Sequence, residues 1–251
     1  MNLNYLHAVV DRLCVIVDQL GSSFPAPKII PQGDGFVERH GNAERTNGLL
    51  CYLKAVKTCS TLNGILTLLE KAQVQEAYAL ARVAQDQVDD IHFLIIPRGD
   101  GLRLNDRQTQ AIDEFFLEEF DPADPVGTSQ ERNRVGRPKV RAAITNDMTD
   151  PSTGNATSTL IYRVFSGYVH GAYGHVMELH GADGHYQMRG TPRHLTDAIE
   201  YTPNIIYQSL LAAAVLIDRS SRDDLAPSIK ALRDEVASTC DVLPKTGTAA
   251  P

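Results

Sequence analysis

Apolar residues recur at helical spacing along most of the chain, with polar residues between them. Residues 4–20 show the pattern most clearly, because apolar side chains return every three or four positions until Gly21 ends the run. Similar segments follow at residues 44–71, 73–95, 106–120, 158–179, 194–219 and 225–238. Strand patterns are nearly absent. The sequence therefore predicts an all-α helical bundle of about six or seven helices with long irregular loops.

These helices are expected to form a single helical domain over residues 1–243. Its core helices would lie within residues 44–95 and 158–219. Residues 22–41 contain three prolines and three glycines, which predicts an irregular crossing between helices. The similar segments IIPQGDG at residues 29–35 and IIPRGDG at residues 95–101 are interpreted as turns. Residues 244–251 offer almost nothing to bury and are predicted to be a disordered tail.

Composition and charge narrow the class of protein. The sequence shows no signal peptide and no apolar run long enough to span a bilayer, so we expect a cytoplasmic protein that does not bind membranes. A net charge of −7 argues against general affinity for nucleic acid, although a local basic patch could bind one. The four cysteines lack CxxC spacing and are expected to be structural thiols. No phosphate-binding glycine loop or nucleophile motif is present, which predicts no cofactor.

The helix predicted at residues 158–179 carries the main chemical candidates. Arg163 and His170 are seven residues apart, so they share a face within roughly 20°. An arginine that is always charged beside a histidine that titrates near neutral pH suits work on a phosphodiester. The opposite face should be buried, in particular at Phe165, Tyr168, Val169 and Val176. Histidines at positions 170, 175, 180 and 185 have the wrong spacing for helical metal ligands, so no metal site is predicted.

Two other charged segments could support such a site. Residues 131–141 read ERNRVGRPKVR, which predicts a flexible basic loop whose Arg132, Arg134, Arg137 and Arg141 would bind RNA or, equally, pair with acids of the helix at 106–120. In the helix at 73–95, Arg82, Asp86 and Asp89 share one face. They are interpreted as a solvated ladder of ion pairs, with the alternative that one carboxylate pairs with Arg163 or orients His170.

The segment RVFSGYVH, residues 163–170, resembles the signature of the HEPN superfamily of small helical bundles, in which an arginine precedes a histidine by a few residues. The resemblance implies a metal-independent endoribonuclease whose two protomers form the active cleft, as in toxin–antitoxin and phage-defence systems. His170 would take the proton of the 2′-hydroxyl and Arg163 would stabilise the charged phosphorane. Ser166 and Gly167 would line the substrate site. RNA, a second copy and an inhibitor or antitoxin protein would be the partners.

Alternatives remain open beside this resemblance. Arg189 and His194 form a second pair at permitted spacing, because a chain of this composition produces such pairs by chance. The segments around FPAPKIIPQGDGFVER, DPSTGN and YRVFSGYVHG are also similar to a group of bacterial helical proteins, which implies only a helical fold. The chain could be a non-catalytic module that binds RNA or protein through the same face. It could also be a scaffold in which Arg163 and His170 serve packing, and exposure of their face would argue against that.

Overall fold

The protein is an all-α helical bundle with one small β-hairpin, as a computed structural model describes it for residues 2–32, 35–95, 104–117, 135–146, 150–181, 183–240 and 242. Nine α-helices lie within these ranges. The long helices are α1 (Leu3–Gly21), α2 (Asn47–Glu70), α3 (Val74–Ile95), α6 (Pro151–Val169), α8 (Pro192–Arg219) and α9 (Ala226–Cys240). The shorter ones are α4 (Asp106–Phe116), α5 (Arg137–Thr145) and α7 (Tyr173–Met177). The prediction of an all-α bundle is confirmed.

Helix boundaries follow the local chemistry of the chain. The Asn2 side chain accepts a hydrogen bond from the backbone N–H of Asn4 and starts α1, and the Thr46 hydroxyl accepts from Leu49 N–H to start α2. At α4, Asn105 and Gln108 form a reciprocal capping box. Helix α8 passes through Pro203 as one helix of 28 residues. Side-chain caps therefore explain where several of these helices begin.

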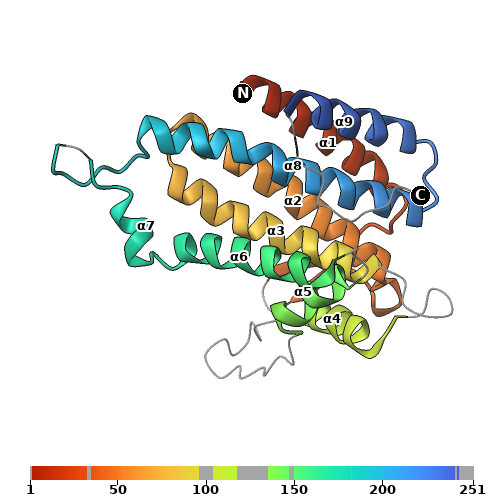
Figure 1. The fold of residues 1–251 in the computed structure, drawn as a ribbon. Coiled ribbons are helices and arrows are strands. Elements are labelled where there is room, and N and C mark those ends of the chain that lie inside the picture. Colours follow the sequence, from red (N-terminus) through yellow and green to blue (C-terminus); the bar gives the residue numbers. More distant parts are fainter. Residues whose placement is uncertain are drawn as a thin grey trace.

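Helix α3 lies at the centre of the bundle and packs on α2, α5, α6 and α8 (Figure 1). On one side α1 and α9 run side by side and cover α2 and α8, and on the other α6 lies along α3 (Figure 1). The buried apolar residues of these helices form one continuous cluster. Its largest fully buried side chains include Leu13, Leu62, Ile91, Ile206 and Leu210. None of the described helices is long and apolar enough to cross a membrane.

The segment between α1 and α2 differs from its prediction. Instead of an irregular crossing, residues 28–39 form an antiparallel hairpin of β1 (Lys28–Gln32) and β2 (Gly35–Arg39), followed by a 3₁₀ turn η1 (Asn42–Glu44). The prolines mislead here because Pro31 is tolerated in a two-stranded ribbon with free edges. The first IIPQGDG segment thus contributes residues 29–32 to β1 and Gly35 to β2. Most of the second one, like the tail at residues 244–251, lies outside the described residues.

Candidate functional site

Helix α6 presents Arg163 and His170 to solvent. The helix starts at Asp150, whose carboxylate accepts a hydrogen bond from Thr153 N–H, and Pro151 occupies its first turn. The side chains of Arg163 and His170 are both exposed. Within the described ranges, neither side chain forms an ion pair or a hydrogen bond with another residue. The pair is therefore available to a ligand and does not contribute to the core.

Val169 is the last residue of this helix and His170 is its C-cap, so the helix ends ten residues before the predicted boundary at residue 179. Gly171 adopts a left-handed conformation with φ +58, and the N–H of Ala172 donates to the carbonyl of Gly167 at 2.9 Å. This is the Schellman arrangement, in which glycine ends a helix because it tolerates positive φ. The prediction of one continuous helix over residues 158–179 is therefore wrong. His170 lies at the helix end, and the chain turns immediately after it.

The short helix α7 folds back onto α6 at Gly167. A Cβ atom at Gly167 would lie 2.2 Å from Cε1 of His175, so the imidazole occupies the place of the missing side chain. The His175 ring also meets the Tyr168 ring edge-on at 4.1 Å, and the Tyr168 hydroxyl donates to Glu178 at 3.0 Å. The Gln75 amide of α3 donates to the His175 carbonyl. Gly167, predicted to line a substrate site, is thus covered by a histidine of the same chain.

Burial along α6 and α7 agrees with the prediction only in part. Phe165 is buried and contacts the rings of Tyr78 at 5.6 Å and Tyr201 at 5.2 Å, and Tyr168 is half-buried against the same core. Val169 and Val176 are exposed, contrary to expectation, because the chain leaves the bundle after His170. Figure 1 shows α7 beyond the end of α6. Ser166 is half-buried at the border between the two sides of α6.

The opposite side of α6 holds an aromatic ring between two buried arginines. The guanidinium of Arg82 lies 3.8 Å from the centre of the Tyr162 ring, and that of Arg141 lies 4.1 Å from it. Both arginines are buried, at 7% and 4% exposed. A hydrogen bond with Arg82 lowers the pKa of the Tyr162 hydroxyl, and desolvation lowers the pKa of Arg141. Two cations on one ring fix α6 against α3 and α5.

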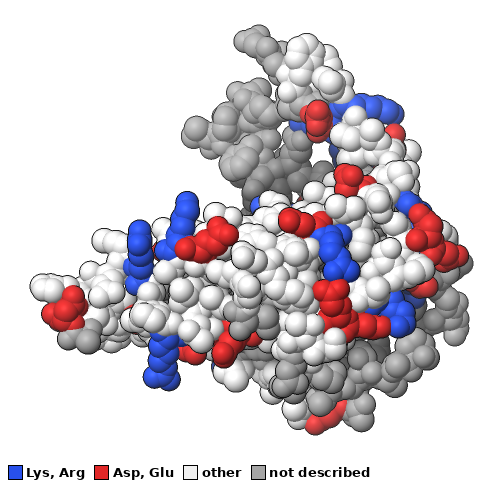
Figure 2. Space-filling model, turned by 90° about the horizontal axis from the view of Figure 1, so that it is seen from above, with Lys and Arg blue, Asp and Glu red and all other residues white. Residues whose placement is uncertain are grey.

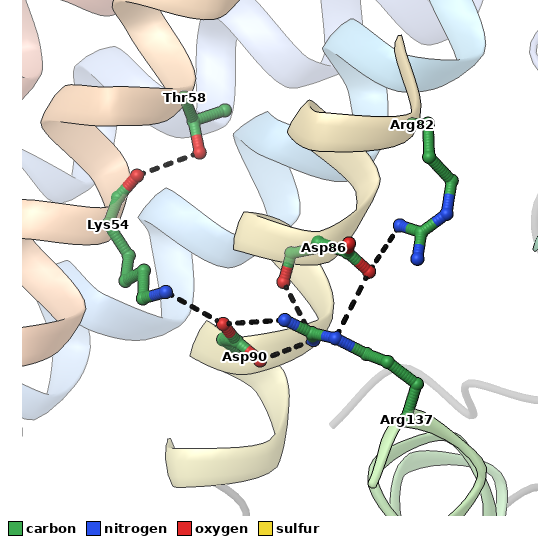
Figure 3. Close-up of polar contacts among 6 residues, drawn as sticks. All are labelled: Lys54, Thr58, Arg82, Asp86, Asp90 and Arg137. Atoms are coloured by element: carbon green, nitrogen blue, oxygen red, sulfur yellow. Dashed lines mark hydrogen bonds and ion pairs between the residues drawn. The ribbon is translucent and has the colours of Figure 1, made fainter. Parts of the chain in front are cut away.

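Aspartates of α3 balance this charge, as Figure 3 shows. Asp86 forms ion pairs with Arg82 and, at 3.3 Å, with Nε of Arg137. Asp90 accepts a hydrogen bond from Nη1 of Arg137 at 2.5 Å and forms an ion pair with Nζ of Lys54 at 2.9 Å. Burial acts to lower the pKa of Arg137, but the hydrogen bond to Asp90 and the charges of Asp90, Asp86 and Asp89 together outweigh burial and raise the pKa. The ion pairs of Lys54, Arg82, Asp86, Asp90 and Arg137, which we call the α3 charge cluster, join α2, α3 and α5.

The basic segment is thus not a flexible loop where it is described. Gly136 and Pro138 begin a helix: Gly136 is the N-cap of α5 and Pro138 lies in its first turn, where a missing N–H costs nothing. Arg137 pairs with Asp86 and Asp90 of α3, and Arg141 lies over the Tyr162 ring of α6, so the described contacts of both arginines are not with acids of α4. Arg132 and Arg134 lie outside the described residues. Two of the four arginines predicted to bind RNA, Arg137 and Arg141, are therefore occupied by contacts within the protein.

The interpretation of Arg82, Asp86 and Asp89 as a solvated ladder is also wrong. Arg82 and Asp89 are buried, and Gln85 donates to Asp89 at 2.7 Å. No described contact joins these carboxylates to Arg163 or His170, which lie on the other side of α6. Lys54 and Tyr162 were missed by sequence reasoning. A signal existed for Lys54, since a lysine in a helix rich in apolar residues needs a buried acid partner.

The surface formed by α1 and α9 carries mixed charge. In the view of Figure 2, which looks onto α1 and α9, acidic and basic side chains are interspersed and form no continuous basic field. Two ion pairs of this kind are Arg12–Glu235 at 2.7 Å and Lys230–Asp234 at 2.5 Å. In the described part of the chain, no group of three or more His, Cys, Asp or Glu side chains could hold a metal ion. His180 instead packs edge-on against Tyr186 at 5.1 Å.

Comparison with known proteins adds no assignment. No family model matches the sequence, no curated protein matches it, and no solved structure matches the fold. The resemblance to the HEPN superfamily therefore rests on the motif of residues 163–170 alone. The geometry of α6 is the basis for any functional proposal.

Proposed function

We propose that the protein is a metal-independent endoribonuclease that uses Arg163 and His170 of α6. One observation carries this proposal: both side chains are exposed on one face of a helix whose other face is fixed in the core. A purely structural arginine would be expected to pair with a carboxylate, as Arg82 and Arg137 do. The exposed face therefore argues against a scaffold in which Arg163 and His170 serve only packing.

The proposed chemistry is transesterification within RNA. Neutral His170 accepts the proton of a 2′-hydroxyl, and the resulting oxygen attacks the adjacent phosphorus. Arg163 donates to the phosphorane oxygens and stabilises their charge. The 5′ oxygen leaves and is protonated by solvent, so the products carry a 2′,3′-cyclic phosphate and a 5′-hydroxyl. His175, over Gly167 one helical turn from Arg163, lies near enough to contact the same substrate.

A second copy of the chain is proposed to complete the cleft. Leu160 and Val164 flank Arg163 on α6 and are 62% and 44% exposed. Adjacent apolar side chains of this kind suit a protein partner. The same observation favours the second candidate function, a non-catalytic module that binds RNA or an inhibitor protein through this face.

The experiment compares RNA cleavage in EDTA by wild type, Arg163→Ala and His170→Ala. We expect wild-type cleavage with cyclic phosphate ends and a loss of at least about 100-fold in each variant. Arg189→Ala and His194→Ala provide the matched control, because that pair has the same residue types at permitted spacing outside the proposed site. Thermal melts run in parallel separate loss of chemistry from loss of fold. RNA left intact by wild type, but bound by it, would favour the non-catalytic module.

A further inference from the structure

Cys14 of α1 and Cys59 of α2 meet across the interface of these two helices. The Asn63 amide donates a hydrogen bond to the Cys14 sulfur at 3.7 Å, and the Cys59 thiol hydrogen-bonds to the same sulfur. Cys59 and Asn63 are four residues apart on α2, so they reach Cys14 from one helix face. The two thiols are therefore hydrogen-bonded neighbours across the α1–α2 interface, and all four cysteines of the chain are free thiols.

The environments of these two sulfurs give them different reactivity. Cys14 is half-buried and is the more exposed of the two residues. The hydrogen bonds from Cys59 and Asn63 lower the Cys14 pKa to about 7, against the effect of burial. Cys59 is only 7% exposed, and its hydrogen bond to Cys14, together with desolvation, raises its pKa. A substantial fraction of Cys14 is therefore thiolate at neutral pH, and Cys59 is the protonated neighbour.

We propose that Cys14 and Cys59 form an oxidisable dithiol, which a peroxide converts into a disulfide that links α1 to α2. The Cys14 sulfur attacks one peroxide oxygen, the O–O bond breaks, and the released hydroxide takes up a proton to become water. The Cys59 sulfur then attacks the sulfur of the Cys14 sulfenic acid. The S–S bond forms and hydroxide leaves with the Cys59 proton as a second water. Two thiols have then supplied the two electrons that reduce the peroxide.

The other two cysteines lack this arrangement. Cys51 is fully buried, and burial raises its pKa to about 12. Cys240 on α9 is half-buried, and burial raises its pKa as well. Neither has a second thiol hydrogen-bonded to its sulfur among the contacts of the described chain. They therefore serve as internal references for the reactive pair.

The test oxidises the purified protein with hydrogen peroxide, blocks free thiols and digests it with trypsin without reduction. Each cysteine falls in a different tryptic peptide, with Cys14 in residues 13–28 and Cys59 in residues 58–71. Mass spectrometry should find these two peptides linked, at a combined mass lower by two hydrogen atoms, and separated again by dithiothreitol. Brief alkylation by iodoacetamide across pH should show Cys14 reacting with a midpoint near pH 7.

Variants divide the two steps. In Cys59→Ser, Cys14 should still be oxidised, and the sulfenic acid should be trapped by dimedone. In Cys14→Ser, Cys59 should remain a thiol, and Cys240→Ser should leave the linked peptide unchanged. The proposal is overturned if wild type keeps both thiols free under peroxide. Cross-linking of residues 13–28 to the same peptide of a second molecule would overturn it equally, since that result requires no contact with Cys59.

Discussion

The two faces of α6 use the same kinds of side chain in opposite ways. On the inner face, Arg82 and Arg141 enclose the Tyr162 ring, and the carboxylates of the α3 charge cluster balance their charge. On the outer face, Arg163 and His170 extend into solvent beside Leu160 and Val164. Neither residue type nor spacing separates these roles. The two roles differ in whether the side chain has a partner within the fold. Arg163 and His170 have no described internal partner, which makes them candidates for catalysis.

The inner face should be the more sensitive to mutation, and Asp90→Ala tests this most severely. Asp90 pairs with both Arg137 and Lys54, so its loss leaves the shielded Lys54 without its ion-pair partner and Arg137 with Asp86 alone. We expect the free energy of unfolding to fall by about 3 kcal/mol, a fall in Tm of about 6–12 °C. Thermal denaturation measures it. Asp197→Ala, which removes the exposed partner of Arg193 at 4.0 Å, is the control and should change Tm little.

Tyr162→Ala should have the next largest effect. Removing the ring leaves two guanidinium groups facing each other across an empty space, at a cost of about 2 kcal/mol in the free energy of unfolding. Tyr162→Phe keeps the ring and loses only the hydroxyl, so it should retain most of the stability in urea denaturation. Equal losses in both variants would show that the hydroxyl, rather than the stacked ring, holds α6 in place.

Gly167→Ala should release α7 without unfolding the bundle. The new methyl group needs the space of the His175 ring, while alanine itself favours the helix, so the net change in global stability should stay below about 1 kcal/mol. Hydrogen exchange at residues 173–179 should increase. Gly174→Ala is the matched control, because a Cβ there meets nothing within 4 Å. Unchanged exchange in Gly167→Ala would show that α7 docks by other contacts.

Arg163→Ala and His170→Ala should be the mildest changes to the fold. Exposed side chains without internal partners contribute little, so each variant should stay within about 0.5 kcal/mol of wild type in urea denaturation. A much larger loss of unfolding free energy in either variant would show that the residue contributes to packing, as the inner residues of α6 do. The contrast between the two faces of α6 would then not hold. Such a result would also make any loss of RNA cleavage ambiguous.

The bundle could be predicted from the sequence because its long helices carry regular apolar patterns. The helix expected at residues 4–20 is α1 (Leu3–Gly21), and that expected at 225–238 is α9 (Ala226–Cys240). The end of α6 was missed because the role of Gly171 depends on a positive φ that composition does not reveal. The hairpin was missed because its strands are short and contain Pro31.

The candidate site was harder to predict because charge pairing depends on contacts between distant segments. Arg137 lies 47 residues from Asp90 in sequence, and no local sequence pattern predicts that they form an ion pair. The exposed position of Arg163 and His170 agrees with the helical wheel of α6. The wheel failed at Val169 and Val176, since it assumes one straight helix. Local periodicity thus predicted which face of α6 is exposed. The buried positions of the inner arginines could be seen only in the tertiary structure.

The pairing of α1 with α9 constrains how the chain folds during synthesis. Arg12 pairs with Glu235, and Arg222 donates to the Gln19 carbonyl at 2.8 Å and to the Ser22 hydroxyl at 2.9 Å. These contacts join segments about two hundred residues apart in sequence. Helix α1 is therefore synthesised early but can form these contacts only after α9 has been synthesised. Until then its apolar side, with Val10 and Leu13, stays partly uncovered. A nascent chain arrested before residue 225 should therefore bind chaperones through α1, and release them once α9 emerges.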